Sequence, residues 1–466
     1  MSQTVAVVVL DSLRYDIFKN YLRANPNGFF NRLVDSSISF TGATAAAPWS
    51  LPSHASIFTG KYPREHGALQ FNTRIRDEFP TLVDQLNQIG VTTACFTSNE
   101  FVQSDYGFGD WDHFGGHYGH ARFPDAHSPL SDEEGIEKIK DALGQVRASN
   151  KPIKSLLNAF YSQARRSPAL VDDGASSMTK DMIDWLERTP ADDDVFLFCN
   201  YMETHVYHKQ LSTRLRRLWN VRNGRKLDSL HAKLRNKNLD PNATLLNDDD
   251  IALFNRVVAD ELRYLEGRLD RLYDALLQQS QSGDCLFILC SDHGDGLGEE
   301  GFVYHDFGGV TEPLVRVPLV INSPTGRQEK VHRRASLSWI YSTVLNFVDE
   351  HDGPDLADPA TYPTYVAAEN TGHVMDIIDS PEDVHEYYLE DRLAVYQADE
   401  VNRKYVSAGD ECSVYSVETD GIEETRLGEG GRDVIETFEQ RHESKIGTKF
   451  EVSESTERRL RDLGYI

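Results

Sequence analysis

Short apolar runs that each end in polar residues are the feature that most limits how this chain can fold. The clearest are TVAVVVL at 4–10, VTTACFTS at 91–98, DVFLFCNYM at 194–202, DCLFILCSD at 284–292 and VPLVINSP at 317–324. Amphipathic stretches with helical spacing separate them, at 15–25, 81–90, 178–189 and 259–279. Strands that are apolar throughout and alternate with helices are typical of a largely parallel sheet covered on both faces. We therefore predict an α/β fold with a doubly wound, mostly parallel sheet.

The pattern changes after about residue 350. Residues 392–421 alternate apolar and polar side chains and contain turn signals, which predicts an antiparallel sheet. The ending ESTERRLRDLGYI, 454–466, predicts a short helix. We expect a larger α/β domain at 1–350 and a small C-terminal α+β subdomain at 351–466.

The charge balance excludes some partners. The chain has 74 acidic and 48 basic residues and a formal net charge of −26. Such a surface argues against general nucleic-acid binding. It is typical of proteins kept soluble in concentrated salt, so we expect a halophilic source.

One insert at about 206–240 reverses this charge. Its segment 209–237 contains a single acid, Asp228, among many arginines and lysines. Two interpretations remain open: a helical hairpin packed against the acidic body, or a lid that gathers a polyanionic substrate.

The five cysteines have no CxxC spacing, and three of them lie in apolar runs. We therefore expect core cysteines, with neither a disulfide framework nor a zinc site. The apolar run at the N-terminus is too short for a signal sequence, and no segment approaches the ~20 apolar residues of a membrane span. The sequence predicts a cytoplasmic protein without a membrane span.

Polar residues at the strand ends indicate a metal site. Asp11 follows the first apolar run, and Asp292 and His293 follow the run at 284–290. In parallel sheets, ligands bind beyond the carboxyl ends of the strands. Two carboxylates and one imidazole suit a divalent cation such as Ca²⁺, Mn²⁺ or Mg²⁺. For each aspartate alone, a helix cap or loop residue is the alternative.

The stretch APWSLPSHASIFTGKYPREHG, 47–67, indicates a nucleophile. Pro52 suits the first turn of a helix, which places Ser50 where free N–H groups and the helix dipole favour an anion. A serine there, next to a cation, would be activated for attack. The alternative is a structural cap, a role that Ser53 can fill and so leave Ser50 free.

Four blocks in order carry a resemblance to a known family: VVVLDSLRYD, APWSLPSHASIFTGKYPREHG, SDHGDGLGEEG and VTEPLVRVPLVI. Together they resemble the sulfatase family of the alkaline phosphatase superfamily over roughly the first 325 residues, and the closing RRLRDLGYI is also similar. The resemblance implies a sulfatase-like catalytic domain at 1–350, in which a metal-bound nucleophile attacks a sulfate or phosphate ester. Among the metals, it favours Ca²⁺.

The resemblance also implies site residues. Ser50 matches the serine or cysteine that matures to formylglycine, and Asp11, Asp292 and His293 match metal ligands. His205 matches a histidine that contacts the anionic group, His305 lies near the position of a leaving-group residue, and Asn72 resembles an anion-contacting asparagine. His205 and His305 are also candidate proton donors, because an imidazole titrates near neutral pH. The alternatives are hydrogen-bonded structural histidines and an ordinary turn asparagine.

Two residues depart from the family pattern. Many sulfatases have a second aspartate where this chain has Ser12. The maturation signal ends in arginine where this chain has His54, a weaker and pH-dependent candidate for binding the substrate anion. A formylglycine hydrate releases sulfate by elimination. A plain serine sulfate cannot do so, whereas a serine phosphate can be hydrolysed by in-line attack.

We therefore predict a metal-dependent hydrolase of sulfate esters that uses Ser50 or its formylglycine derivative. The enzymatic alternative is a phosphodiesterase, phosphonate hydrolase or phospho-transferase with unmodified Ser50. The non-enzymatic alternative is a member that only binds anionic glycans. The expected partner is a small-molecule or glycan sulfate or phosphate ester, and the sequence leaves its organic part and the oligomeric state open.

Overall fold

The structure is a computed structural model of the 466-residue chain. It describes residues 2–116, 144–147, 149, 151–155, 174–205, 224–234, 246–280, 283–299, 303–305, 309–371, 390–398, 402–453 and 456–457.

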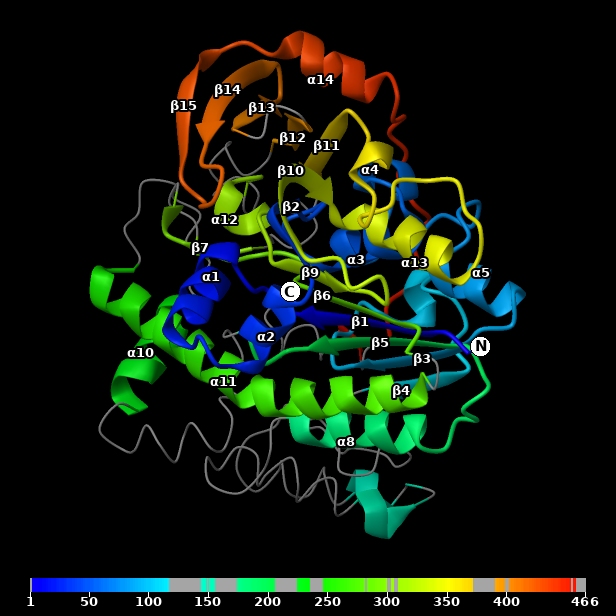
Figure 1. Ribbon diagram of the computed structural model, residues 1–466. Coiled ribbons are helices and arrows are strands. Elements are labelled where there is room, and N and C mark those ends of the chain that lie inside the picture. Colours follow the sequence, from blue (N-terminus) through cyan, green and yellow to red (C-terminus); the bar gives the residue numbers. More distant parts are fainter. Residues whose placement is uncertain are drawn as a thin grey trace.

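An eight-stranded sheet forms the centre of the molecule (Figure 1). In spatial order its strands are β10 (Glu329–Ser336), β2 (Ile38–Thr44), β9 (Leu319–Asn322), β6 (Cys285–Cys290), β1 (Thr4–Leu10), β5 (Val195–Tyr201), β3 (Thr92–Thr97) and β4 (His113–Gly116). All pairings are parallel except those of β9, which is antiparallel to β2 and β6. The central strands are buried along their whole length, which explains their uninterrupted apolar sequences.

Helices cover both faces of this sheet (Figure 1). One face packs against α1 (Tyr15–Ala24), α2 (Phe29–Asp35), α8 (Ala175–Leu186) and the long α11 (Asp248–Gln279). The other packs against α3 (Ser50–Thr59), α5 (Leu82–Gln88) and α13 (Ile340–Val348). The start of α11 is fixed by a capping box in which Asn247 and Asp250 bond to each other's backbone N–H.

A second, antiparallel sheet lies at the C-terminal end. Its strands are β11 (Tyr365–Asn370), β12 (Arg392–Gln397), β13 (Arg403–Ala408), β14 (Glu411–Val417) and β15 (Glu424–Glu429), in sequence order. Helix α14 (Arg432–Glu439) packs on one face through Val434, Ile435 and Phe438. The backbone N–H of Glu369 in β11 donates to Ala46 O at 2.8 Å and so ties this sheet to the main one.

Shorter elements complete the described chain. They are α4 (Pro63–His66), η1 (Ser104–Tyr106), α10 (Gly224–Leu234), β7 (Gly296–Leu297), β8 (Val303–Tyr304), α12 (Glu312–Val315), η3 (Leu337–Trp339) and η4 (Pro359–Thr361). The strands β7 and β8 form a small hairpin directly after the Asp-His block.

The predicted fold class is confirmed: a mostly parallel sheet between helices, with a separate antiparallel sheet near the C-terminus. The boundary at residue 350 stays a prediction. Of the basic insert only α10 is described, and the predicted helix at 454–466 lies almost wholly outside the described residues. All five cysteines are described and are free thiols.

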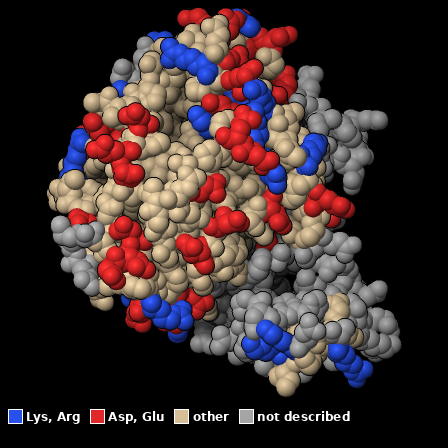
Figure 2. All heavy atoms as spheres, turned by 90° about the vertical axis from the view of Figure 1, so that its right-hand side faces the viewer, with Lys and Arg blue, Asp and Glu red and all other residues tan. Residues whose placement is uncertain are grey.

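Two further observations concern the surface and the membrane. Acidic side chains are spread in groups over the face shown in Figure 2, with fewer basic ones between them. Among the helices of the described chain, none combines the length and apolar character that a bilayer crossing requires.

Candidate active site

The carboxyl ends of β1 and β6 bring three predicted ligands together. Asp11 directly follows β1, whereas Asp292 and His293 lie just beyond β6, and the two strands are neighbours. All three side chains are fully buried, and their ligand atoms lie within 4.8 Å of one another. The expectation that these distant residues converge at one sheet edge is met by the geometry.

The hydroxyl of Ser50 lies in the same cluster. Ser50 is the first residue of α3, and its Oγ donates to Asp292 Oδ2 at 3.0 Å and lies 3.2 Å from His293 Nε2. Ser53 does not cap the helix: its Oγ donates instead to Asp292 O at 2.6 Å, and the N-cap residue Trp49 makes no side-chain cap bond. The expected capping role of Ser53 is therefore wrong, and both serines hold α3 against the Asp-His loop.

The electrostatics of this cluster favour a cation. Burial, together with the neighbouring charge of Asp292, raises the pKa of Asp11 well above its ordinary value. Among the described residues, no lysine or arginine forms an ion pair with either carboxylate. Two carboxylates, one imidazole and one hydroxyl are a donor set that a divalent cation accepts. The residues present therefore fit a metal ion.

Amide side chains position Asp11. Asn99 Nδ2 and Asn200 Nδ2 donate to Asp11 Oδ2 at 2.9 and 3.1 Å, and Ser12 Oγ donates to Oδ1 at 3.0 Å. The backbone N–H of Ser12 also donates to Asp292 Oδ1 at 3.1 Å. Ser12, at the position where the family pattern has a second aspartate, thus bonds to both Asp11 and Asp292 without adding a charge.

His54 lies one helical turn after Ser50 in α3. Its Nδ1 donates to Ser50 O at 2.8 Å, and its Nε2 accepts from Asn200 Nδ2 at 3.1 Å. Burial lowers the pKa of this imidazole, although the charge of Asp292 opposes the shift. In this arrangement both ring nitrogens have protein partners and the ring is neutral, so a contact with substrate stays a prediction.

Three further rings form a row beside the cluster. The His305 ring lies 4.3 Å from that of His293 and 5.2 Å from that of His205, measured between centroids. Asp295 Oδ1 accepts from His305 Nδ1 at 2.5 Å, and Tyr304 stacks on His305 at 4.0 Å. The backbone of Tyr304 has φ 91°, a conformation that residues other than glycine rarely adopt. Such backbone conformations cluster at functional sites.

Asn72 lies in a different setting. Its carbonyl accepts from Phe450 N at 2.9 Å, within a loop that pairs with the C-terminal segment. Among the described residues, no hydrogen bond joins Asn72 to the carboxylates or to Ser50.

Sequence reasoning did not single out Asn200 or Asp295. Asn200 lies in the otherwise apolar strand β5, and a lone amide in such a strand is a signal that could have marked it. Asp295 is the second acid of the SDHGDG block, but its partner His305 is reached only through the β7–β8 hairpin.

Comparisons with known proteins identify relatives of the chain. A model of the sulfatase family matches residues 3–350, about three quarters of the chain. A choline-sulfatase of Rhizobium meliloti (strain 1021) is 23% identical over 344 residues, which cover 69% of this chain and 62% of that protein. The chain therefore spans less than two thirds of this relative.

Solved structures share the fold. A phosphonate monoester hydrolase of Agrobacterium radiobacter aligns with a TM-score of 0.60 at 16% identity and covers 90% of each chain. A protein whose structure was solved in complex with its substrate D-glucosamine-2-N,6-O-disulfate aligns with a TM-score of 0.59 at 14% identity, over 99% of this chain and 98% of that one.

Proposed function

The chain belongs to the sulfatase family, and from this premise we propose that it is a metal-dependent hydrolase of sulfate esters. Ser50, or a formylglycine derived from it, is the nucleophile in this proposal. The observation that carries it is the position of Ser50 Oγ, 3.0 Å from Asp292 and 3.2 Å from His293 at the start of α3.

Asp11, Asp292 and His293 would hold the cation, with Ca²⁺ favoured by the family and Mn²⁺ or Mg²⁺ as alternatives. When bound, the ion supplies positive charge that lowers the pKa of the hydroxyl and stabilises the anionic ester oxygens. His293 Nδ1 donates to Gly294 O at 2.9 Å, which leaves Nε2 as the acceptor directed toward Ser50. The N-terminal end of α3 adds favourable dipole charge at the attacking oxygen.

His305 or His205 protonates the leaving alkoxide in this proposal. Asp295 accepts from Nδ1 of His305, so the Nε2 side of the ring is the one presented to the site. We favour His305, because its ring lies 4.3 Å from that of His293 and has this carboxylate partner. His54 and Asn72 remain proposed substrate-binding residues.

A second candidate is phosphoester or phosphonate hydrolysis by unmodified Ser50. The observation that favours it is His54, a neutral ring where the maturation signal has arginine. The structural likeness to a phosphonate monoester hydrolase is compatible with this chemistry. The related transferase reaction and a non-catalytic anionic-glycan-binding protein complete the alternatives.

The organic part of the substrate is proposed only as a class. The relatives act on or bind choline sulfate and a disulfated glucosamine, so a small-molecule or glycan ester is the proposed substrate. We also propose a cytoplasmic location and a halophilic source.

The test is an assay of purified protein, in high salt, on aryl sulfate, phosphate monoester, phosphate diester and phosphonate monoester panels with Ca²⁺, Mn²⁺ or Mg²⁺. Turnover that disappears in Ser50→Ala and persists in the surface control Ser323→Ala supports the proposal. The loss of two hydrogens from the Ser50 peptide in mass spectrometry identifies formylglycine and favours sulfate. If metal-loaded protein turns over nothing and Ser50→Ala binds sulfated glycan as wild type does, the non-catalytic alternative holds.

A further inference from the structure

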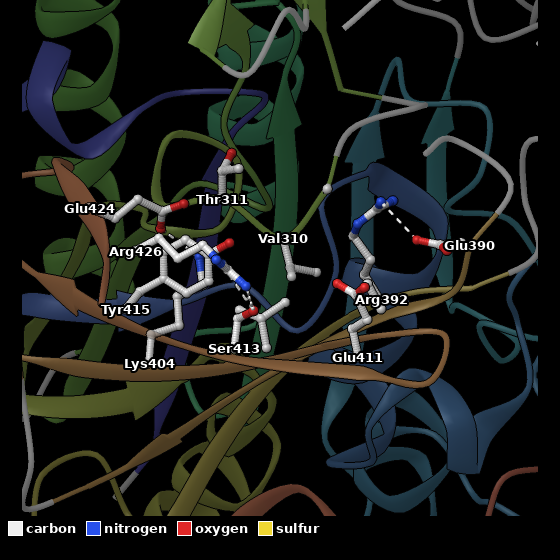
Figure 3. A pocket seen from close by; sticks show the side chains of 13 residues that line it. Val310, Thr311, Glu390, Arg392, Lys404, Glu411, Ser413, Tyr415, Glu424 and Arg426 are labelled. Atoms are coloured by element: carbon white, nitrogen blue, oxygen red, sulfur yellow. Dashed lines mark hydrogen bonds and ion pairs between the residues drawn. The ribbon is translucent and has the colours of Figure 1, made fainter. Parts of the chain in front are cut away.

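A cavity of about 420 Å³ lies in the C-terminal part of the molecule (Figure 3). Strands β12 to β15 line one side of it, and the segment Gly309–Thr311, which leads into α12, lines another. Side chains alternate between the two faces of a sheet. The cavity-facing Lys404 and Val406 therefore lie opposite Tyr405, which packs against α14. The volume is within the range of small-molecule sites.

The strand register arranges the lining in rows across the sheet. Lys404 pairs with Tyr415, which pairs with Arg426, and this row marks one end of the cavity. Arg392, Ala408 and Glu411 form the row at the other end. The rows are four residues apart along β13 and β14, or about 13 Å at the rise of a β-strand.

A positive charge remains at the first end. Lys404, which is 1% exposed, pairs with Glu424 at 2.6 Å. Arg426 is held differently: its Nε and Nη2 donate to Ser413 Oγ at 3.2 and 3.0 Å (Figure 3). Within the described part of the chain, no carboxylate forms an ion pair with Arg426. Its guanidinium is therefore oriented by a neutral hydroxyl, and no carboxylate of the described residues pairs with its positive charge.

A negative charge remains at the other end. Arg392 Nη2 lies 3.4 Å from Glu390 Oε2, which balances that pair. Glu411 lies beside them in the same row, and no described lysine or arginine forms an ion pair with it. Between the two ends, Val310 and Val406 give the cavity apolar surface beside Ser413, whose hydroxyl is bonded to Arg426.

We propose that this cavity binds a small amphoteric ligand, with its anionic group against Arg426 and its amine against Glu411. The three basic and three acidic side chains of the lining sum to zero, so a simple anion or a simple cation meets repulsion as well as attraction. A ligand with both charges, joined by a methylene chain, neutralises both ends and places its chain against the apolar surface of Val310 and Val406. This site is separate from Ser50 and its carboxylates.

The experiment is calorimetric titration of the full chain at low ionic strength with 4-aminobutanoate, 6-aminohexanoate and 8-aminooctanoate. Hexanoate and hexylamine serve as the singly charged controls. We expect one amino acid of the series to bind at one site, and the singly charged compounds to bind at least about tenfold more weakly. Arg426→Gln and Glu411→Gln should each weaken binding by about tenfold or more, the cost of a lost charge-assisted hydrogen bond.

Matched controls are Arg403→Gln, next to Lys404 in β13 on the opposite face, and Glu436→Gln, exposed on α14. Neither should change the affinity, and Ser50→Ala should bind as wild type does whether or not the chain is a hydrolase. The proposal is overturned if no amino acid of the series binds, if hexanoate or hexylamine binds as tightly, or if Ser50→Ala abolishes binding. Should a variant fail to fold, the affinities of the wild type for the amino acids, which carry both charges, and for the singly charged compounds still decide whether the proposal holds.

Discussion

Three imidazole rings around Ser50 are held through the same nitrogen. Nδ1 of His293 is bonded to Gly294 O, Nδ1 of His54 to Ser50 O, and Nδ1 of His305 to Asp295. An acceptor at Nδ1 fixes the tautomer of a neutral ring and leaves Nε2 to meet the ligand or reacting atom. The hydrogen-bond acceptors at Nδ1 differ in charge, however. Only His305 has a carboxylate as this acceptor, the partner expected for a ring that takes up a second proton, whereas the Asp292 carboxylate lies 3.5 Å from Nδ1 of His54.

We expect Asp295→Asn to lower kcat while KM changes little. Asn can still bond to the ring, but it no longer selects the tautomer or balances a charged imidazole, and general acid catalysis contributes about 10²- to 10⁴-fold. Steady-state kinetics on the best substrate of the panel measure the effect. A proportional rise in KM with unchanged kcat would instead indicate that Asp295 only shapes the binding site.

At this scale the sequence predicted the residues that belong to contiguous blocks. Ser50, Asp292 and His293, which the structure brings together, were proposed because strand ends and a helix start carry recognisable residue types. Asn200 was missed because an amide inside an apolar run has no meaning until the strand order places it beside Asp11. The Asp295–His305 pair depends on the turn of a short hairpin, which residue types alone do not determine.

At the scale of elements, α4 supports α3, the helix that carries Ser50. His66 at the end of α4 is fully buried, and its Nε2 lies 3.1 Å from both Pro52 O and Ser56 Oγ of α3. Ala68 N donates to Nδ1 at 3.1 Å, so Nε2 carries the proton. Burial, which outweighs these contacts, lowers the pKa of His66 to about 3.

This shift predicts acid sensitivity. Below the ordinary value of 6.5 the unfolded chain protonates His66, whereas the folded protein does not until about pH 3. The free energy of unfolding therefore falls as pH decreases through this window, by about 1.4 kcal/mol per pH unit from this residue. Urea denaturation of wild type and His66→Gln at pH 7.5 and 5.5 should show a loss smaller by about that amount in the variant. Equal losses would contradict the assignment.

Helix α12 joins the second sheet to the loop that carries Asp292 and His293. Gly294 N donates to Leu314 O at 2.7 Å, and a Cβ on Gly294 would lie 2.0 Å from Pro313 O. On its other side, Glu312 accepts from Tyr396 of β12 at 2.6 Å. The position of the loop that carries Asp292 and His293 thus depends on this one turn.

We expect Glu312→Gln to destabilise the protein by about 3–5 kcal/mol, the cost of removing one partner from a buried ion cluster. Arg334, Arg316 and Lys404 lie 3.0, 3.4 and 3.9 Å from its carboxylate. Burial alone would raise the pKa of Glu312, but these cations outweigh it and lower the pKa to about 2. Chemical denaturation measures the change. The surface control Glu329→Gln should cost less than about 1 kcal/mol, and a similarly small cost at Glu312 would contradict the prediction.

The strands of the sheet centre were predictable, and those of its edges were not. The runs at 4–10 and 284–290 coincide with β1 and β6 because strands buried on both faces are apolar throughout. In contrast, β2 and β10 contain many polar residues, since they lie toward one edge of the sheet. The antiparallel direction of β9 also has no local signature, because it follows from the path of the chain between β6 and β2.

For the whole molecule, charge is the property that the sequence determined most directly. The excess of 74 acids over 48 bases appears on the face shown in Figure 2 as groups of carboxylates with fewer cations between them. Groups of like charge repel one another in the folded state more than in the expanded unfolded chain. The fold should therefore be weakest at low ionic strength.

We expect the free energy of unfolding to rise as NaCl is increased from about 0.01 M to 1 M, because the Debye length shortens from about 30 Å to 3 Å over this range. Urea denaturation along this series measures it. Screening should act mostly below about 0.5 M and equally with NaCl and KCl, whereas exclusion of salt from the surface grows steadily with concentration and differs between sulfate and chloride. A flat response below 0.5 M would show that cations already balance the acidic groups, and would remove the physical reason for inferring a halophilic source.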